Sequence, residues 1–145
     1  MVKAFILLGI FLLNLYVLNK FRALSRVAAG IDFTLTGAFL AGYWFGFKTG
    51  FYIGLLFMLS YYAMTLDFGM HTIINTVLCG IVGLIGAFAF QSGIQAKIAG
   101  IATVIIFCLL SDSISLWIGE RDFFSLFMFD AGAILFNFII FRIFF

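Results

Sequence analysis

Two carboxylates set inside apolar stretches are the residues of this sequence best suited to chemistry. Asp112 stands beside Ser111 and close to Ser115, and Asp130 lies well inside the apolar stretch Phe123–Phe145. Ser111 and Ser115 are four residues apart, so on a helix they share a face. A charged group at the centre of a bilayer costs about 2.5–3.5 kcal/mol on insertion scales, so it must face protein or a water-filled cavity. Both acids are therefore candidates for a binding site.

Further polar residues fall in the same half of the expected helices as Asp112. We predict that together they form a polar, solute-binding cavity that opens toward the acid-rich side of the membrane. The predicted site residues are Asn14, Asp32, Tyr61, Tyr62, Asp67, His71, Ser111, Asp112, Ser115 and Asp130. Asn14 and Asn137 are the expected hydrogen-bond partners of Asp130. The alternative for both Asp112 and Asp130 is a solvated or locally hydrogen-bonded set at the end of a helix.

The sequence gives little evidence of a catalytic or metal-binding site. His71 is the only histidine, and the sequence has no Gly-x-Ser-x-Gly of a serine hydrolase and no Gly-x-Gly-Asp of an aspartyl peptidase. Cys79 and Cys108 form no CxxC pair and are expected to be small buried apolar residues. We expect no enzyme activity, no cofactor and no metal site. The net charge of +2, without a dense basic cluster, also gives no reason to expect nucleic acid as a partner.

The composition decides which elements can position these residues. Of 145 residues, 66% are hydrophobic and 10% are charged, against roughly 45–50% and 25% in an average soluble domain. The mean hydropathy is +1.27. The apolar runs are continuous, whereas a membrane strand would alternate apolar and polar residues over about 10 positions. The chain is therefore expected to be an integral membrane protein built of helices and surrounded by lipid.

Polar residues divide the chain into six apolar stretches. They predict an all-α, polytopic membrane protein with six transmembrane helices in a single domain, residues 1–145. The predicted spans are Ala4–Leu18, Asp32–Phe45, Gly50–Leu66, Thr72–Phe90, Gln95–Ile118 and Phe123–Phe145. A turn is expected at Phe47-Lys48-Thr49. An amphipathic segment at Phe21–Gly30 is expected to lie along the membrane interface.

Six spans place both termini on one side of the membrane. The Lys and Arg residues are split evenly between the two sides, so the positive-inside rule does not decide the orientation. The other side holds Asp32, Asp67, Glu120 and Asp122, and the side of the termini holds no acid. This imbalance favours cytoplasmic termini in a cell-membrane protein. The first stretch is expected to be retained and not cleaved as a signal peptide, because Lys20, Arg22 and Arg26 follow it directly.

Glycines recur every four residues across the second and third stretches. Gly42, Gly46, Gly50 and Gly54 clear a helix face so that a neighbouring backbone can approach closely. Packing within this hairpin is one interpretation, and docking of a partner subunit is the other. The fourth stretch has a second set of glycines, Gly80, Gly83 and Gly86, which leaves one helix face without bulky side chains. Close packing against a neighbouring helix is expected there.

The hairpin resembles a known family. Residues 30–54, with Gly46, Gly50 and Gly54 at their glycine positions, look like the second and third helices of the substrate-binding subunits of energy-coupling factor transporters. The resemblance implies capture of a vitamin-like small solute, a transmembrane coupling subunit as partner, and ATPases that supply energy. No Gly-x-x-x-x-Gly-Lys-[Ser/Thr] sequence is present, so the chain itself is not expected to hydrolyse ATP.

A non-catalytic scaffold, similar to the rod-shape-determining membrane proteins, is the alternative. The two functions differ in what the helices should enclose. A solute-binding subunit should contain a cavity of about 300 Å³ or more. A scaffold should have a filled interior and glycine faces on its outside.

Overall fold

The computed structural model describes residues 1–21, 33–66, 68–119 and 123–144, and all regular structure in these ranges is helical. The helices are α1 (Val2–Phe21), α2 (Thr34–Phe45), α3 (Phe47–Thr65), α4 (Met70–Gln91), α5 (Ala96–Ile118) and α6 (Phe123–Phe144). The prediction of an all-α chain with six helices is confirmed. The predicted amphipathic segment beyond Phe21, and the site residues Asp32 and Asp67, lie outside the described residues.

A single glycine separates α2 from α3. Gly46 has φ 87° and ψ −179°, a conformation that is essentially confined to glycine. Its backbone reverses the chain at one residue, and α3 begins directly at Phe47. The prediction of a turn at residues 47–49 was therefore wrong, because Lys48 and Thr49 already belong to the first turn of α3.

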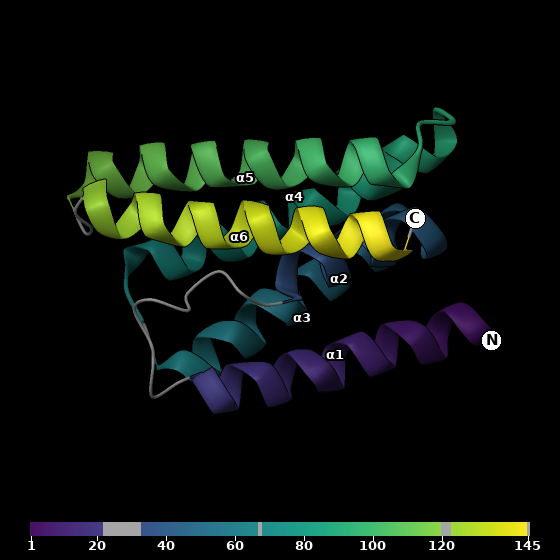
Figure 1. Cartoon of the computed structure of the whole chain (residues 1–145), viewed down its shortest axis with the longest axis horizontal. Coiled ribbons are helices and arrows are strands. Elements are labelled where there is room, and N and C mark those ends of the chain that lie inside the picture. The colour runs from purple at the N-terminus through teal and green to yellow at the C-terminus, as the bar shows by residue number, and fades with distance from the viewer. Residues whose placement is uncertain (22–32, 67, 120–122, 145) are drawn as a thin grey trace.

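The short helix α2 forms the centre of the bundle. Each of its residues from Thr34 to Gly42 is buried, and α3 and α4 pack against it most extensively. On the outside, α5 and α6 lie side by side, and α1 lies along the far side of α2 and α3 (Figure 1). The start of α1 and the end of α6 are at the same end of the bundle (Figure 1).

Close glycine contacts join α2, α3 and α4. A Cβ atom at Gly42 would overlap the carbonyl oxygen of Gly83, and one at Gly50 would lie 2.6 Å from the same oxygen. One turn further along α3, a Cβ at Gly54 would overlap the carbonyl oxygen of Cys79. Packing by the glycines of the fourth stretch is confirmed, and three helix backbones touch along this seam.

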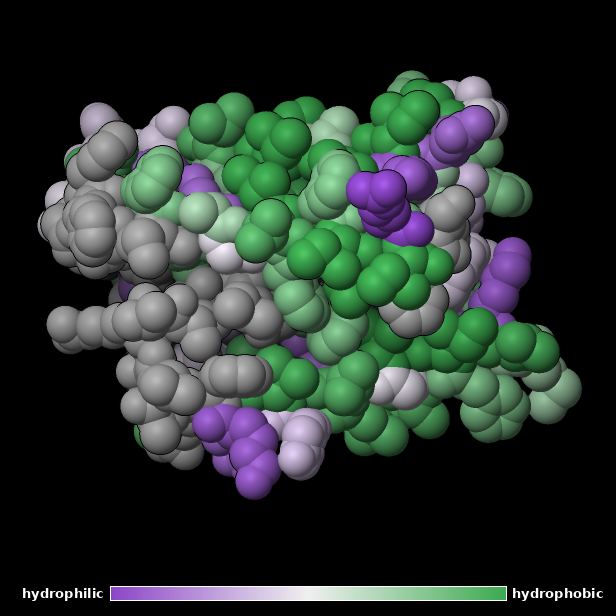
Figure 2. Space-filling view, in the orientation of Figure 1, coloured by the Kyte–Doolittle hydropathy of each residue, from purple (hydrophilic) through white to green (hydrophobic). Residues whose placement is uncertain are grey.

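Within the described parts of the chain, three helices are long and apolar enough to cross a membrane. They are residues Val2–Lys20 in α1, all of α4 and all of α5. Among the residues coloured by hydropathy in Figure 2, hydrophobic side chains predominate, and hydrophilic ones gather mainly toward the ends of the molecule. These features indicate a multi-pass membrane protein. With 12 residues, α2 is about 18 Å long and cannot cross a hydrocarbon core of about 30 Å in a straight line.

The antiparallel course of the helices leads to a testable topology. In a background with Cys79 and Cys108 changed to alanine, single cysteines at Lys48 and Lys97 should react with an impermeant reagent from the side of both termini. Cysteines at Asp67 and Glu120 should react only from the other side. Labelling of positions 48 and 120 from one side would contradict six spans. The native cysteines are 0% and 1% exposed, so their removal lowers background labelling without altering the surface.

Candidate functional site

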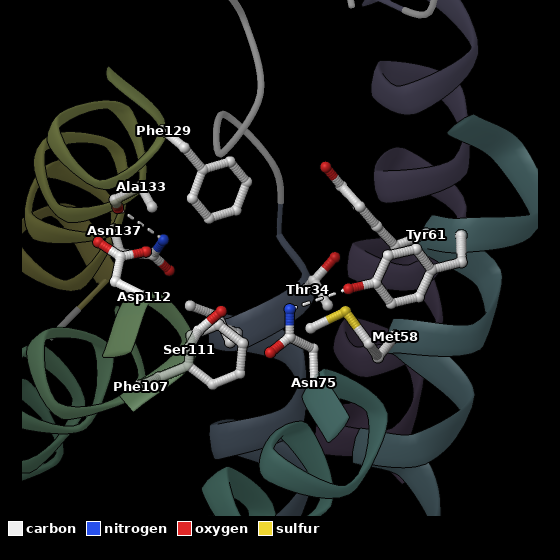
Figure 3. A pocket seen from close by; sticks show the side chains of 12 residues that line it. Thr34, Met58, Tyr61, Asn75, Phe107, Ser111, Asp112, Phe129, Ala133 and Asn137 are labelled. Atoms are coloured by element: carbon white, nitrogen blue, oxygen red, sulfur yellow. Dashed lines mark hydrogen bonds between the residues drawn. The ribbon is translucent and has the colours of Figure 1, made fainter. Parts of the chain in front are cut away.

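A small polar cavity lies where α2, α3, α4, α5 and α6 meet. Its volume is about 20 Å³, which is room for about one water molecule. Each of the five helices contributes at least one polar side chain to its wall (Figure 3). The polar lining residues are Thr34, Tyr61, Tyr62, Asn75, Ser111, Asp112 and Asn137, and the apolar ones are Leu35, Met58, Phe107, Phe129 and Ala133.

One wall of this polar cavity comes from α2, α3 and α4. The amide nitrogen of Asn75 donates a hydrogen bond of 3.0 Å to the hydroxyl of Tyr62, and Asn75 and Tyr62 are both buried. The ring of His71 packs edge-on against the ring of Tyr62, with 5.6 Å between centroids. His71 therefore supports the wall from behind and does not line the cavity.

The opposite wall comes from α5 and α6. Ser111 and Asp112 face the cavity from α5, and Asn137 faces it from α6 (Figure 3). Asn137 donates to the carbonyl of Ala133 at 2.8 Å and accepts a hydrogen bond from the hydroxyl of Thr36. Because Thr36 belongs to α2, this bond joins the two walls.

Asn14 has a structural position beside the cavity. Its side chain is fully buried, accepts a hydrogen bond of 2.8 Å from the Phe33 backbone N–H and donates one of 3.3 Å to the Thr34 hydroxyl. A side chain of α1 thus satisfies the start of α2, which has no cap from its own sequence. Asn14 does not line the cavity itself.

Asp130 is half-buried on α6, outside the polar cavity. Its Oδ1 atom is buried and has no hydrogen-bond partner among the described residues. The partners expected from the sequence, Asn14 and Asn137, form their hydrogen bonds elsewhere. Asn14 bonds to Phe33 and Thr34, and Asn137 bonds to Thr36 and Ala133.

The structure thus brings together four of the predicted site residues, Tyr61, Tyr62, Ser111 and Asp112. Ser115 is buried on α5 one turn from Ser111, outside the lining. Sequence reasoning missed Thr34 and Asn75, and it considered Asn137 only as a partner for Asp130. The available signal was an isolated asparagine within an apolar helix, which is costly to bury unless it is hydrogen-bonded.

The glycines predicted to dock a partner subunit do not all have the same role in the structure. Gly42, Gly50 and Gly54 lie against the backbone of α4, inside the chain. A Cβ at Gly46 would meet nothing within 4 Å, so this residue serves the turn and not a close contact. The glycine face that a partner would need is covered by α4.

Comparison with known protein families, curated proteins and solved structures finds no match for this chain. The class of protein is therefore defined by its fold and cavity. It is an all-α protein whose long apolar helices could cross a membrane and whose interior holds a polar cavity with one carboxylate.

Proposed function

We propose that this protein is a membrane-embedded solute-binding subunit and that the polar cavity is its binding site. The observation that carries this proposal is the convergence of polar side chains from five helices, Asp112 among them, on one point inside an otherwise apolar bundle. Polar and ionisable groups within a membrane are expensive, and they commonly mark a substrate or ion pathway. One carboxylate among hydroxyl and amide groups suits a small solute that donates hydrogen bonds or carries positive charge.

The volume of the cavity limits what it holds in this conformation. At about 20 Å³ it is far below the roughly 300–1,000 Å³ of typical ligand pockets. A vitamin-like solute therefore requires the two walls to separate. The wall of α2, α3 and α4 is joined backbone to backbone by glycines, so we propose that the α5–α6 wall moves and breaks the bond between Thr36 and Asn137.

The proposal includes the wider arrangement predicted from the sequence. All six helices would lie in the cell membrane with both termini in the cytoplasm. A transmembrane coupling subunit and ATPases, as in energy-coupling factor transporters, would supply the energy for release of the solute. The bundle leaves surfaces of α1, α5 and α6 open to such a subunit or to lipid, as their many exposed apolar side chains indicate.

The small cavity also favours a second candidate, a non-catalytic membrane scaffold. Its filled interior fits this function. The glycines fit it less well, because Gly42, Gly50 and Gly54 are used within the chain and leave no open glycine face there.

Solute binding can be measured on the purified protein with thiamine, riboflavin and biotin as cationic, neutral and anionic probes. We expect the cationic probe to raise the melting temperature, and Asp112→Asn to weaken its binding about 10- to 100-fold, the equivalent of a charge-assisted hydrogen bond of about 1.5–3 kcal/mol. Asp130→Asn is the matched acid-to-amide change outside the cavity and should leave binding unchanged. If none of the probes binds to the wild type, the scaffold is favoured.

A further inference from the structure

An apolar groove of about 420 Å³ runs between α1 and α3 on the opposite side of the molecule from α5 and α6. Its walls include Leu7, Leu8 and Phe11 of α1, Phe45 of α2, and Ile53 and Leu56 of α3. Among the described residues that line it, Thr49 is the only one with a polar side chain. The apolar lining of the groove therefore suits a hydrocarbon chain.

The groove runs from the starts of α1 and α3, where Ala4 and Thr49 line it, to its inner end at Phe11 and Phe57 farther along these helices. The rings of Phe11 and Phe57 meet edge to face, with 5.1 Å between centroids, at its inner end. From Thr49 to Phe57 along α3 is about 12 Å, close to the roughly 15 Å depth of one leaflet of hydrocarbon. The groove thus matches one acyl chain that enters from the membrane surface.

Two lysines lie at the other end of the groove, where α1 and α3 begin. The helices α1 and α3 begin at the same end of the bundle (Figure 1), so Lys3 and Lys48, in the first turn of each, lie at this end. Both side chains are exposed. Neither α1 nor α3 carries an acidic residue, so the charged side chains that these helices place at this end are both positive.

We propose that this groove binds an anionic phospholipid, with one acyl chain between α1 and α3 and the phosphate against Lys3 and Lys48. Lysines at the end of a membrane helix extend along apolar surface and place their charge at the headgroup level. Basic sites between membrane helices bind anionic headgroups on the cytoplasmic side. The charge pair distinguishes this occupant from a partner helix or a second copy of the chain, since an apolar helix needs no cations at the mouth of the groove. The proposal does not depend on the solute site.

Native mass spectrometry in detergent, with phosphatidylglycerol and phosphatidylcholine added in turn, tests the proposal. We expect the wild type to retain one phosphatidylglycerol in preference to phosphatidylcholine. The double variant K3Q/K48Q should bind phosphatidylglycerol about 30-fold more weakly, from roughly a factor of five for each lysine near an anionic headgroup. Lys20→Gln, which removes one positive charge at the other end of α1, is the control and should bind as the wild type does.

A second variant tests the apolar part of the site. Leu8→Trp places a larger side chain in the groove and should abolish retention of phosphatidylglycerol while leaving the melting temperature of the lipid-free protein unchanged. Equal retention of both lipids, or retention that K3Q/K48Q leaves unaltered, would overturn the proposal. A dimer that Leu8→Trp dissociates, with no lipid retained by the wild type, would assign the groove to a second copy of the chain.

Discussion

Gly83→Ala is expected to destabilise this protein strongly, because the added methyl group would meet the backbone of a neighbouring helix. The new Cβ would overlap the backbone carbonyl of Gly50, and neither backbone can rotate away as a side chain would. Overpacking a core typically costs about 1–3 kcal/mol, and we expect at least the upper end of that range here. Separating α3 from α4 would also disturb the adjoining contact of Gly42 with Gly83.

Thermal unfolding in detergent, followed by tryptophan fluorescence, measures this effect, and size-exclusion chromatography reports the yield of folded protein. Gly9→Ala is the matched control. Gly9 lies inside α1, and a Cβ there would meet nothing within 4 Å. Because alanine favours a helix over glycine by about 1 kcal/mol, this variant should be as stable as the wild type or more so. A wild-type melting temperature for Gly83→Ala would show that the seam between α3 and α4 is not as close as described.

Asn14→Leu is expected to have the second largest effect. Leucine has the same branched shape and number of side-chain heavy atoms as asparagine, but it removes the acceptor of the Phe33 N–H and the donor to Thr34 in a fully buried position. A buried donor left without an acceptor costs about 1–3 kcal/mol, and the lost second bond adds about 0.5–1.5 kcal/mol. The start of α2 should become the weakest part of the bundle.

Hydrogen exchange detects this change directly. In Asn14→Leu, amides in the first turn of α2 should exchange faster than in the wild type, and the melting temperature should fall. Asn19→Leu makes the same replacement at an exposed position of the same helix and should alter neither. Unchanged exchange at the start of α2 in Asn14→Leu would mean that α1 does not hold α2 in place.

The contacts of α2 with α1, α4 and α6 explain how a short helix can occupy the centre of the bundle. α2 is too short to cross a membrane alone, and most of its surface is buried against other helices. Asn14 satisfies its start, and the Gly42 contact with α4 fixes its far half. Thr36 joins it to Asn137 of α6. Every proposed movement of the solute site therefore has to preserve the contacts of α2 with α1 and α4.

The sequence was most informative about the helices themselves. Within a membrane, backbone N–H and C=O groups must be satisfied inside the segment, so continuous apolar stretches become helices whatever their neighbours are. The predicted ends of the fourth, fifth and sixth stretches lie within two residues of α4, α5 and α6. The exception at Lys48 shows the limit of this rule. A lysine in the first turn of a helix resembles a lysine in a loop, and only the backbone of Gly46 distinguishes the two.

The partners of the polar and small residues were decided by the tertiary structure. An asparagine in an apolar helix indicates that a buried partner exists, but the partner of Asn137 is Thr36, 101 residues away in the chain. Likewise, the spacing of Gly42, Gly50 and Gly54 predicts a close approach, while the helix that approaches is α4. The spacing of residues along a helix indicates which face carries polar side chains and which carries small ones. Which helix meets that face depends on how all six pack, and so the sequence alone determined the elements, whereas the packing determined the cavity.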